Sequence, residues 1–156
     1  MHSSVRMERN GGDFAEHGRA DGADPPHSVL QITKTKHKAL QLQWHQESAG
    51  RWGLLSEVDL NALGSRFGVF VIWRNGGSAK MSAVLYVGRG SLQSALAECR
   101  RSTLFSASRL RVTWADVDDP RDLDAVATYL YQQLRPIWGE VMSSASPLAV
   151  NLPLTA

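Results

Sequence analysis

The stretch GVFVIWRNGGSAKMSAVLYVGRGSLQSALAECRR, residues 68–101, contains two apolar runs, a turn signal and the start of a helix. The runs GVFVIW (68–73) and AVLYVG (83–88) are rich in β-branched and aromatic residues, which favour strands. The sequence RNGG that follows the first run is typical of a turn. The two runs therefore predict a β-hairpin.

Two amphipathic helices and a third strand are expected after this hairpin. The first helix has Ser91 as its candidate N-cap, and its apolar residues recur three and four positions apart. These residues are Leu92, Ala95, Leu96 and Cys99. LRVTWADV (110–117) alternates as a strand, and a second helix is expected from the cap Asp119 to the breaker Pro136. The order predicts an α+β fold, a small mixed or antiparallel sheet flanked by helices.

The sequence before this region predicts a tail and an extension. Residues 1–28 contain almost no large apolar side chain, so we expect a disordered N-terminal tail. Residues 29–66 are expected to add a hairpin around the polar centre KTKHK and a short helix, capped by Ser56 and ended by Gly64. The main domain is then expected over residues 67–156.

Composition limits the class of protein. The chain has 156 residues, 43% of them hydrophobic, and a formal net charge of +2 at pH 7, which is too small for a protein that coats nucleic acid by bulk charge. The single cysteine, Cys99, excludes an internal disulfide and a cysteine-only zinc site. No apolar run reaches about 18 residues, and no secretory leader is visible. We expect a soluble, cytoplasmic protein with no membrane partner.

Two pairs of short motifs resemble a known family. GVF (68–70) and YVG (86–88), followed at once by an amphipathic helix, resemble the name motifs of the GIY-YIG nuclease superfamily. YLYQQLRP (129–136) and VNLP (150–153) are similar to its C-terminal part, so the resemblance covers residues 67–153. It implies a GIY-YIG-like fold and metal-assisted hydrolysis of phosphodiester bonds. This chemistry needs a carboxylate-bound cation and a positive charge opposite the reacting phosphate.

The resemblance assigns family roles to five positions, and three of them have lost the required side chain. The first tyrosine of the family falls on Phe70, and the second is kept as Tyr86. The helix arginine that holds the phosphate falls on Ala95, and the metal-binding glutamate falls on Ala127. The terminal asparagine corresponds to Asn151. The site is therefore expected to be degenerate and to need no metal cofactor.

Several arginines remain as candidate phosphate ligands. Arg89 follows YVG at the mouth of the equivalent site. Four more surround the end of the first helix and the start of the next strand: Arg100, Arg101, Arg109 and Arg111. Guanidinium groups pair bidentately with phosphates, and Arg100 and Arg101 are the first candidates beside Arg89. A solvated arginine surface is the alternative.

Two functions from different classes follow. The first is a GIY-YIG-like domain that has lost catalysis and binds DNA, RNA or a protein partner. The second is an active divalent-metal-dependent endonuclease in which Asp124 holds Mg²⁺ from a shifted position and Arg89 contacts the phosphate. All five histidines precede residue 46, so the main domain has no histidine to act as a base or ligand. An unrelated α+β interaction domain is a third possibility.

Overall fold

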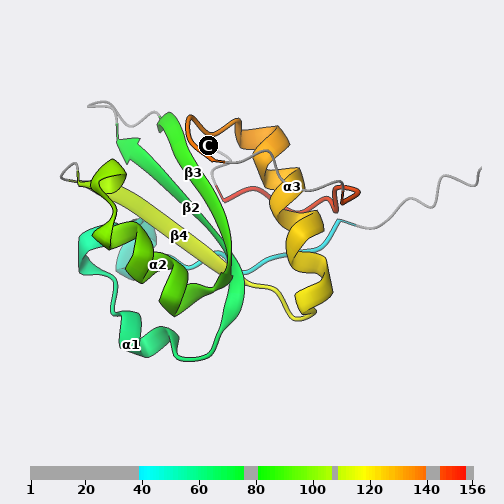
Figure 1. Ribbon diagram of the computed structural model, residues 1–156, viewed down its shortest axis with the longest axis horizontal. Coiled ribbons are helices and arrows are strands. Elements are labelled where there is room, and N and C mark those ends of the chain that lie inside the picture. Colours follow the sequence, from blue (N-terminus) through cyan, green and yellow to red (C-terminus); the bar gives the residue numbers. More distant parts are fainter. Residues whose placement is uncertain (1–38, 76–80, 107–108, 140–144, 154–156) are drawn as a thin grey trace, which may run out of the picture. The chain divides into compact units, whose positions relative to one another are not determined.

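The computed structural model describes residues 39–75, 81–106, 109–139 and 145–153. The predicted tail and the first strand of the hairpin expected around KTKHK lie outside these described residues. The described part is an α+β fold with helices on both sides of one sheet (Figure 1). The expected class is therefore confirmed at this coarse level.

The sheet of the described chain has four strands, all antiparallel, in the order β1-β4-β2-β3. β2 and β3 form the predicted hairpin, and β4 is the predicted third strand. The strands span Gly53–Leu54 (β1), Phe67–Asn75 (β2), Met81–Ser91 (β3) and Leu110–Asp116 (β4). The helices span Leu60–Leu63 (α1), Leu92–Arg101 (α2) and Leu123–Leu134 (α3), with 3-10 turns at Ser48–Gly50, Leu55–Glu57, Thr103–Phe105 and Pro120–Asp122.

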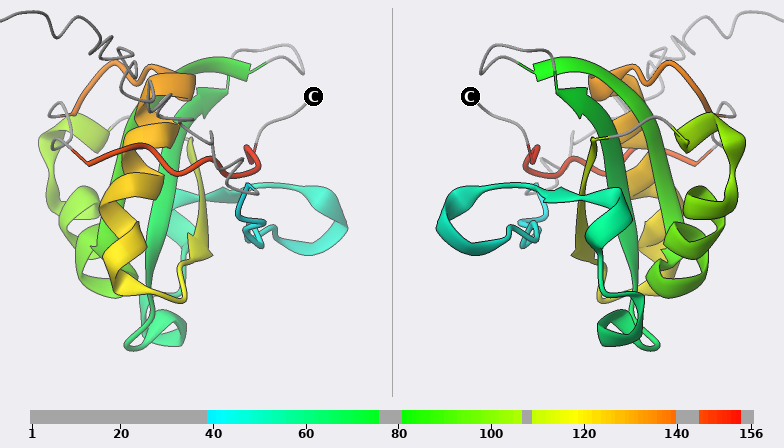
Figure 2. Two further views of the ribbon diagram at one scale, coloured as in Figure 1. Left: turned by 90° about the vertical axis from the view of Figure 1, so that its right-hand side faces the viewer. Right: turned by 90° about the vertical axis from the view of Figure 1, so that its left-hand side faces the viewer.

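The two faces of the sheet carry separate apolar clusters, because side chains alternate along each strand. On β2, Val69 and Val71 belong to the cluster under α3, whereas Phe70 and Ile72 belong to the cluster with α1 and α2. All four side chains are buried. Figures 1 and 2 show α3 on one side of the sheet and α2 on the other. A side chain on β2 therefore faces one helix layer or the other.

The helix ends agree with the sequence in part. The expected cap of the short helix, Ser56, is wrong, because α1 begins later and is capped by Asp59. The Asp59 carboxylate accepts hydrogen bonds from the backbone of Asn61 at 3.0 Å and Ala62 at 3.4 Å, and a carboxylate accepts such bonds at least as well as a hydroxyl. Gly64 follows α1 as expected.

The longer helices begin near their predicted caps. Ser91 precedes α2, but its hydroxyl makes no capping bond to the backbone. Asp119 caps the 3-10 turn before α3 and accepts a hydrogen bond from the backbone of Arg121 at 2.9 Å. α3 ends at Leu134, just before Pro136, as expected.

The segment after residue 38 runs beside the C-terminal segment. The Leu40 amide donates to the Ala149 carbonyl at 2.8 Å, in a parallel bridge between Leu40 and Val150. Further on, the His45 amide donates to the carbonyl of Trp114 on β4 at 2.8 Å. In the described chain, the alternating apolar residues that predict the second strand of the hairpin therefore contact segments that are distant in the sequence.

Among the described residues, no helix is long and apolar enough to cross a membrane.

Candidate functional site

Phe70 and Tyr86 lie side by side on the hairpin, where the resemblance expects two tyrosines. Their ring centroids are 5.9 Å apart, and Phe70 is only 1% exposed. The Tyr86 ring also packs edge-on to Phe105 at 5.6 Å, and Phe105 packs edge-on to Trp138 at 5.7 Å. We call Phe70, Tyr86, Phe105 and Trp138 the aromatic row. The position of the first tyrosine is thus filled by a buried hydrocarbon ring that has no hydroxyl to donate a proton or to orient a water molecule.

Phe105 and Trp138 were not among the predicted site residues. Phe105 belongs to a 3-10 turn, where no apolar periodicity marks it. The Trp138 amide donates to the Leu85 carbonyl at 2.8 Å, so its place is set by pairing with the β3 edge. Contacts between segments this far apart leave no local signal in the sequence.

The structure separates the two alanine positions. Ala95 packs against the cluster that contains Phe70, between the sheet and α2. Ala127 is 0% exposed and belongs to the opposite cluster, beneath α3 with Val69 and Val71. Ala127 therefore does not meet Phe70 and Ala95 in one cleft.

Asn151 has its amide occupied by the backbone of Leu42. Its Oδ1 accepts from the Leu42 amide at 2.6 Å, and its Nδ2 donates to the Leu42 carbonyl at 3.0 Å. Its own carbonyl accepts from Trp44 Nε1 at 2.9 Å. Because both the oxygen and the nitrogen of the amide make hydrogen bonds, Asn151 links the first and the last described segments of the chain.

Arg89 and Asp124 form an ion pair between β3 and the first turn of α3. The side chains are 32% and 51% exposed. Asp124 therefore already faces a cation, and Mg²⁺ would have to compete with a guanidinium for its oxygens. Within the described ranges there is no group of three or more histidine, cysteine, aspartate or glutamate side chains that could hold a metal.

The remaining arginines divide into bound and exposed ones. Arg100 donates through Nε to the Leu55 carbonyl at 2.7 Å and through Nη2 to the Val58 carbonyl. Arg111 Nη1 donates to the Trp52 carbonyl at 2.6 Å. These two guanidinium groups hold the chain before α1 in place.

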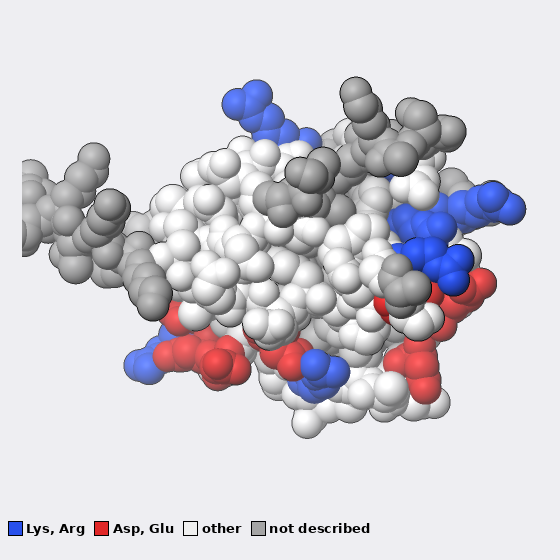
Figure 3. All heavy atoms as spheres, turned by 180° about the vertical axis from the view of Figure 1, so that it is seen from behind, with Lys and Arg blue, Asp and Glu red and all other residues white. Residues whose placement is uncertain are grey.

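Arg101 and Arg109 are exposed, and Arg109 has a left-handed backbone with φ of 69°. We call Arg100, Arg101, Arg109 and Arg111 the arginine end. Figure 3 shows basic side chains gathered at one edge of the molecule, with acidic side chains close beside them. The charge there is mixed, so phosphate contact depends on the reach of individual arginines rather than on a broad basic field.

No family model, curated protein or solved structure matches the chain.

Cys99 is a buried free thiol with a raised pKa. It is buried between α2 and the sheet, and this burial, with a smaller contribution from Glu98, raises the pKa of the thiol to about 11. The thiol stays protonated at neutral pH, and the protonated form is unreactive.

Proposed function

We propose that this chain is a GIY-YIG-like domain that binds nucleic acid through its arginine end and does not cleave it. One observation carries the part of the proposal that concerns cleavage. Phe70, Ala95 and Ala127, at the positions where the resemblance implies tyrosine, arginine and glutamate, all pack against apolar residues. None of them offers an oxygen to a cation or a positive charge to a phosphate.

The order of elements supports the family part of the proposal. The resemblance implies two motif strands in a hairpin, a helix directly after them, and a later helix. β2, β3, α2, β4 and α3 follow in that order. Fold alone does not carry function, so the binding part of the proposal depends on Arg101 and Arg109, whose side chains are exposed.

Salt dependence tests the binding. We expect fluorescence anisotropy to detect binding of a labelled single-stranded oligonucleotide at low salt, with the affinity falling steeply as salt rises, because each neutralised phosphate releases counterions. Arg101→Ala should reduce the slope of log affinity against log salt by roughly 0.7, the contribution of one contact to a single strand. Arg121→Ala, an exposed arginine paired with Asp119, is the control. Absence of binding at low salt would overturn the proposal and favour a protein partner.

A second candidate is the divalent-metal-dependent endonuclease. Asp124 favours it, because this half-exposed carboxylate stands one turn before Ala127 on α3 with Arg89 beside it. An assay with Mg²⁺ or Mn²⁺ decides between the two: cleavage abolished by Asp124→Asn would support the enzyme, and absence of cleavage would support the binding domain.

A further inference from the structure

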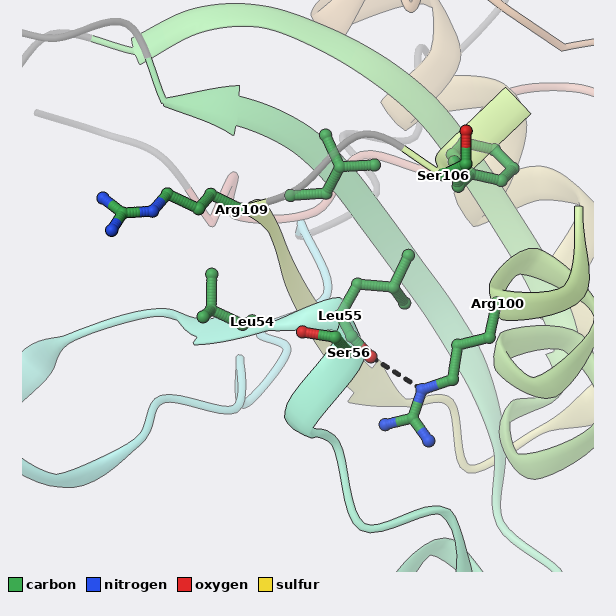
Figure 4. Close-up of a pocket in the computed structure, with 8 residues that line it drawn as sticks. Leu54, Leu55, Ser56, Arg100, Ser106 and Arg109 are labelled. Carbon is green, nitrogen blue, oxygen red and sulfur yellow. Dashed lines mark hydrogen bonds between the residues drawn. The ribbon is translucent and has the colours of Figure 1, made fainter. Parts of the chain in front are cut away.

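A hollow of about 420 Å³ opens between the 3-10 turn after β1 and the end of α2 (Figure 4). Its apolar part includes Leu55 and Leu110, each 3% exposed, and Phe105 of the aromatic row. Its polar part includes Ser56 and Ser106, both exposed. Sites for small ligands are of this size and combine apolar walls with a few polar groups.

Arg100, on the α2 side of this hollow, is held rigidly. Arg100 is fixed by its bonds to the carbonyls of Leu55 and Val58, and Figure 4 shows its guanidinium beside Leu55 and Ser56. Carbonyls orient this charge without neutralising it, and no carboxylate of the described chain forms an ion pair with Arg100. A pre-oriented cation of this kind favours an anionic ligand at little cost in side-chain entropy.

A second arginine stands at the rim. Arg109 extends outward in Figure 4, from the opposite side of the hollow to Arg100. Exposed side chains change rotamer within nanoseconds, so this guanidinium can turn toward an anion at the mouth. The left-handed backbone of Arg109, with φ of 69°, sets the direction in which its side chain leaves the start of β4.

Phe105 is the aromatic residue that lines the hollow, and it is half-buried. Its own ring is held edge-on between Tyr86 and Trp138, so it is fixed from two sides. Nucleobases stack on such rings, and serine hydroxyls bond to base edges.

We propose that this hollow, the nucleotide pocket, binds one nucleotide, with its base against Phe105 and the leucines and its phosphate between Arg100 and Arg109. The inference rests on the proposed function and deepens it, because it makes the ligand an unpaired nucleotide of a single strand. Arg101, exposed at the last residue of α2 and next to Arg100 in the sequence, is then available to the next phosphate of the strand.

Three small probes separate the parts of the ligand. Isothermal titration should detect adenosine 5′-monophosphate, with weaker binding of adenosine, which lacks the phosphate, and of ribose 5-phosphate, which lacks the base. Ser56→Phe fills the mouth from an exposed position and should lower the affinity for adenosine 5′-monophosphate by at least about tenfold, the loss expected for one stacked base.

A charge variant with a matched control covers the case in which Ser56→Phe disturbs folding. Arg109→Asn removes the guanidinium and keeps a residue that tolerates a left-handed backbone. This variant should bind the nucleotide and ribose 5-phosphate more weakly, but its affinity for adenosine should be unchanged. Arg135→Asn is the control, since Arg135 also has a positive φ, of 46°, and follows α3 on the other face of the sheet.

The outcomes separate this inference from the proposed function. The proposal of a nucleotide pocket is overturned if Ser56→Phe and Arg109→Asn bind adenosine 5′-monophosphate as tightly as the parent does. It is also overturned if the parent does not bind that nucleotide at millimolar concentration. If the oligonucleotide still binds with an Arg101-dependent salt slope in that case, the proposed function survives alone. Nucleotide binding without oligonucleotide binding supports the pocket and overturns the proposed function.

Discussion

The Phe70 ring lies against Gly88 so closely that a Cβ atom at position 88 would stand 2.2 Å from Phe70 Cζ. The two residues are also direct partners in the β2–β3 ladder. Gly88 is the glycine of the YVG motif, so packing alone accounts for it in this chain. The same contact explains why a phenyl ring fits at position 70: the end of the ring lies over a residue that has no side chain.

Gly88→Ala should therefore destabilise the protein by about 2–3 kcal/mol, because an overpacked core forces strands or rings to shift. Urea unfolding measures this loss. The double variant Gly88→Ala with Phe70→Leu should lose less than the sum of the two single variants, since leucine lacks Cζ. Gly53→Ala is the control: its added Cβ meets only the end of the Glu47 side chain, which can move away. Additive losses at positions 70 and 88 would contradict the contact.

Local periodicity predicted much of the fold. The runs on β2 and β3 and the stripes of α2 and α3 are visible because each element buries one or both faces, and burial imposes a period on the sequence. The α1 cap was misplaced because Ser56 and Asp59 both suit an N-cap and only the helix start decides between them.

The candidate site was harder to predict, because it depends on which sheet face each helix covers. Periodicity marked Ala95 and Ala127 as apolar helix positions, and both pack against the core. The periodicity does not show that α2 and α3 cover opposite faces of the sheet. That arrangement separates Ala127 from Phe70. Residue type also gave no sign that Arg100 binds carbonyls, because an arginine pairs with any nearby acceptor.

The glutamate that the resemblance implies at position 127 should strongly destabilise the domain rather than provide a metal ligand. Ala127→Glu places a carboxyl group at a position that is 0% exposed, under α3, and we expect a loss of more than about 4 kcal/mol. Gln132→Glu, at an exposed position on the same helix, should cost little. Thermal unfolding compares the two variants.

The pH dependence of Ala127→Glu gives a second check. Burial raises the pKa of the introduced carboxyl above its unfolded value, so the folded state binds the extra proton. The loss should therefore shrink as pH falls toward about 4 and grow as pH rises. A loss that is the same at all pH values would indicate that the carboxyl reaches water.

The thiol of Cys99 should lower the free energy of unfolding at alkaline pH. Because burial raises the pKa of its thiol from 9.0 to about 11, the folded state keeps a proton that the unfolded state loses between these values. The thiol's contribution is complete below about pH 8 and is lost as pH rises through 9 to 11, by up to about 2–3 kcal/mol. Other groups titrate there too, so the measurement is the difference between the parent and Cys99→Ala in unfolding free energy. Parallel pH curves for the two proteins would disprove the buried thiol.

The amide of Asn151 should be needed to hold the segment around Leu42. Asn151→Asp keeps the size of the side chain and the acceptor for the Leu42 amide, but it replaces the donor that faces the Leu42 carbonyl with a carboxylate oxygen. Because two acceptors then face each other, we expect a loss of about 1–3 kcal/mol and faster hydrogen exchange at the Leu42 amide. Asn61→Asp, at an exposed asparagine in α1, is the control and should change neither quantity. The loss from Asn151→Asp should shrink at acid pH, where the protonated carboxyl can donate to the Leu42 carbonyl again. Unchanged exchange at Leu42 in Asn151→Asp would mean that the segment is held by its apolar contacts instead of by the amide.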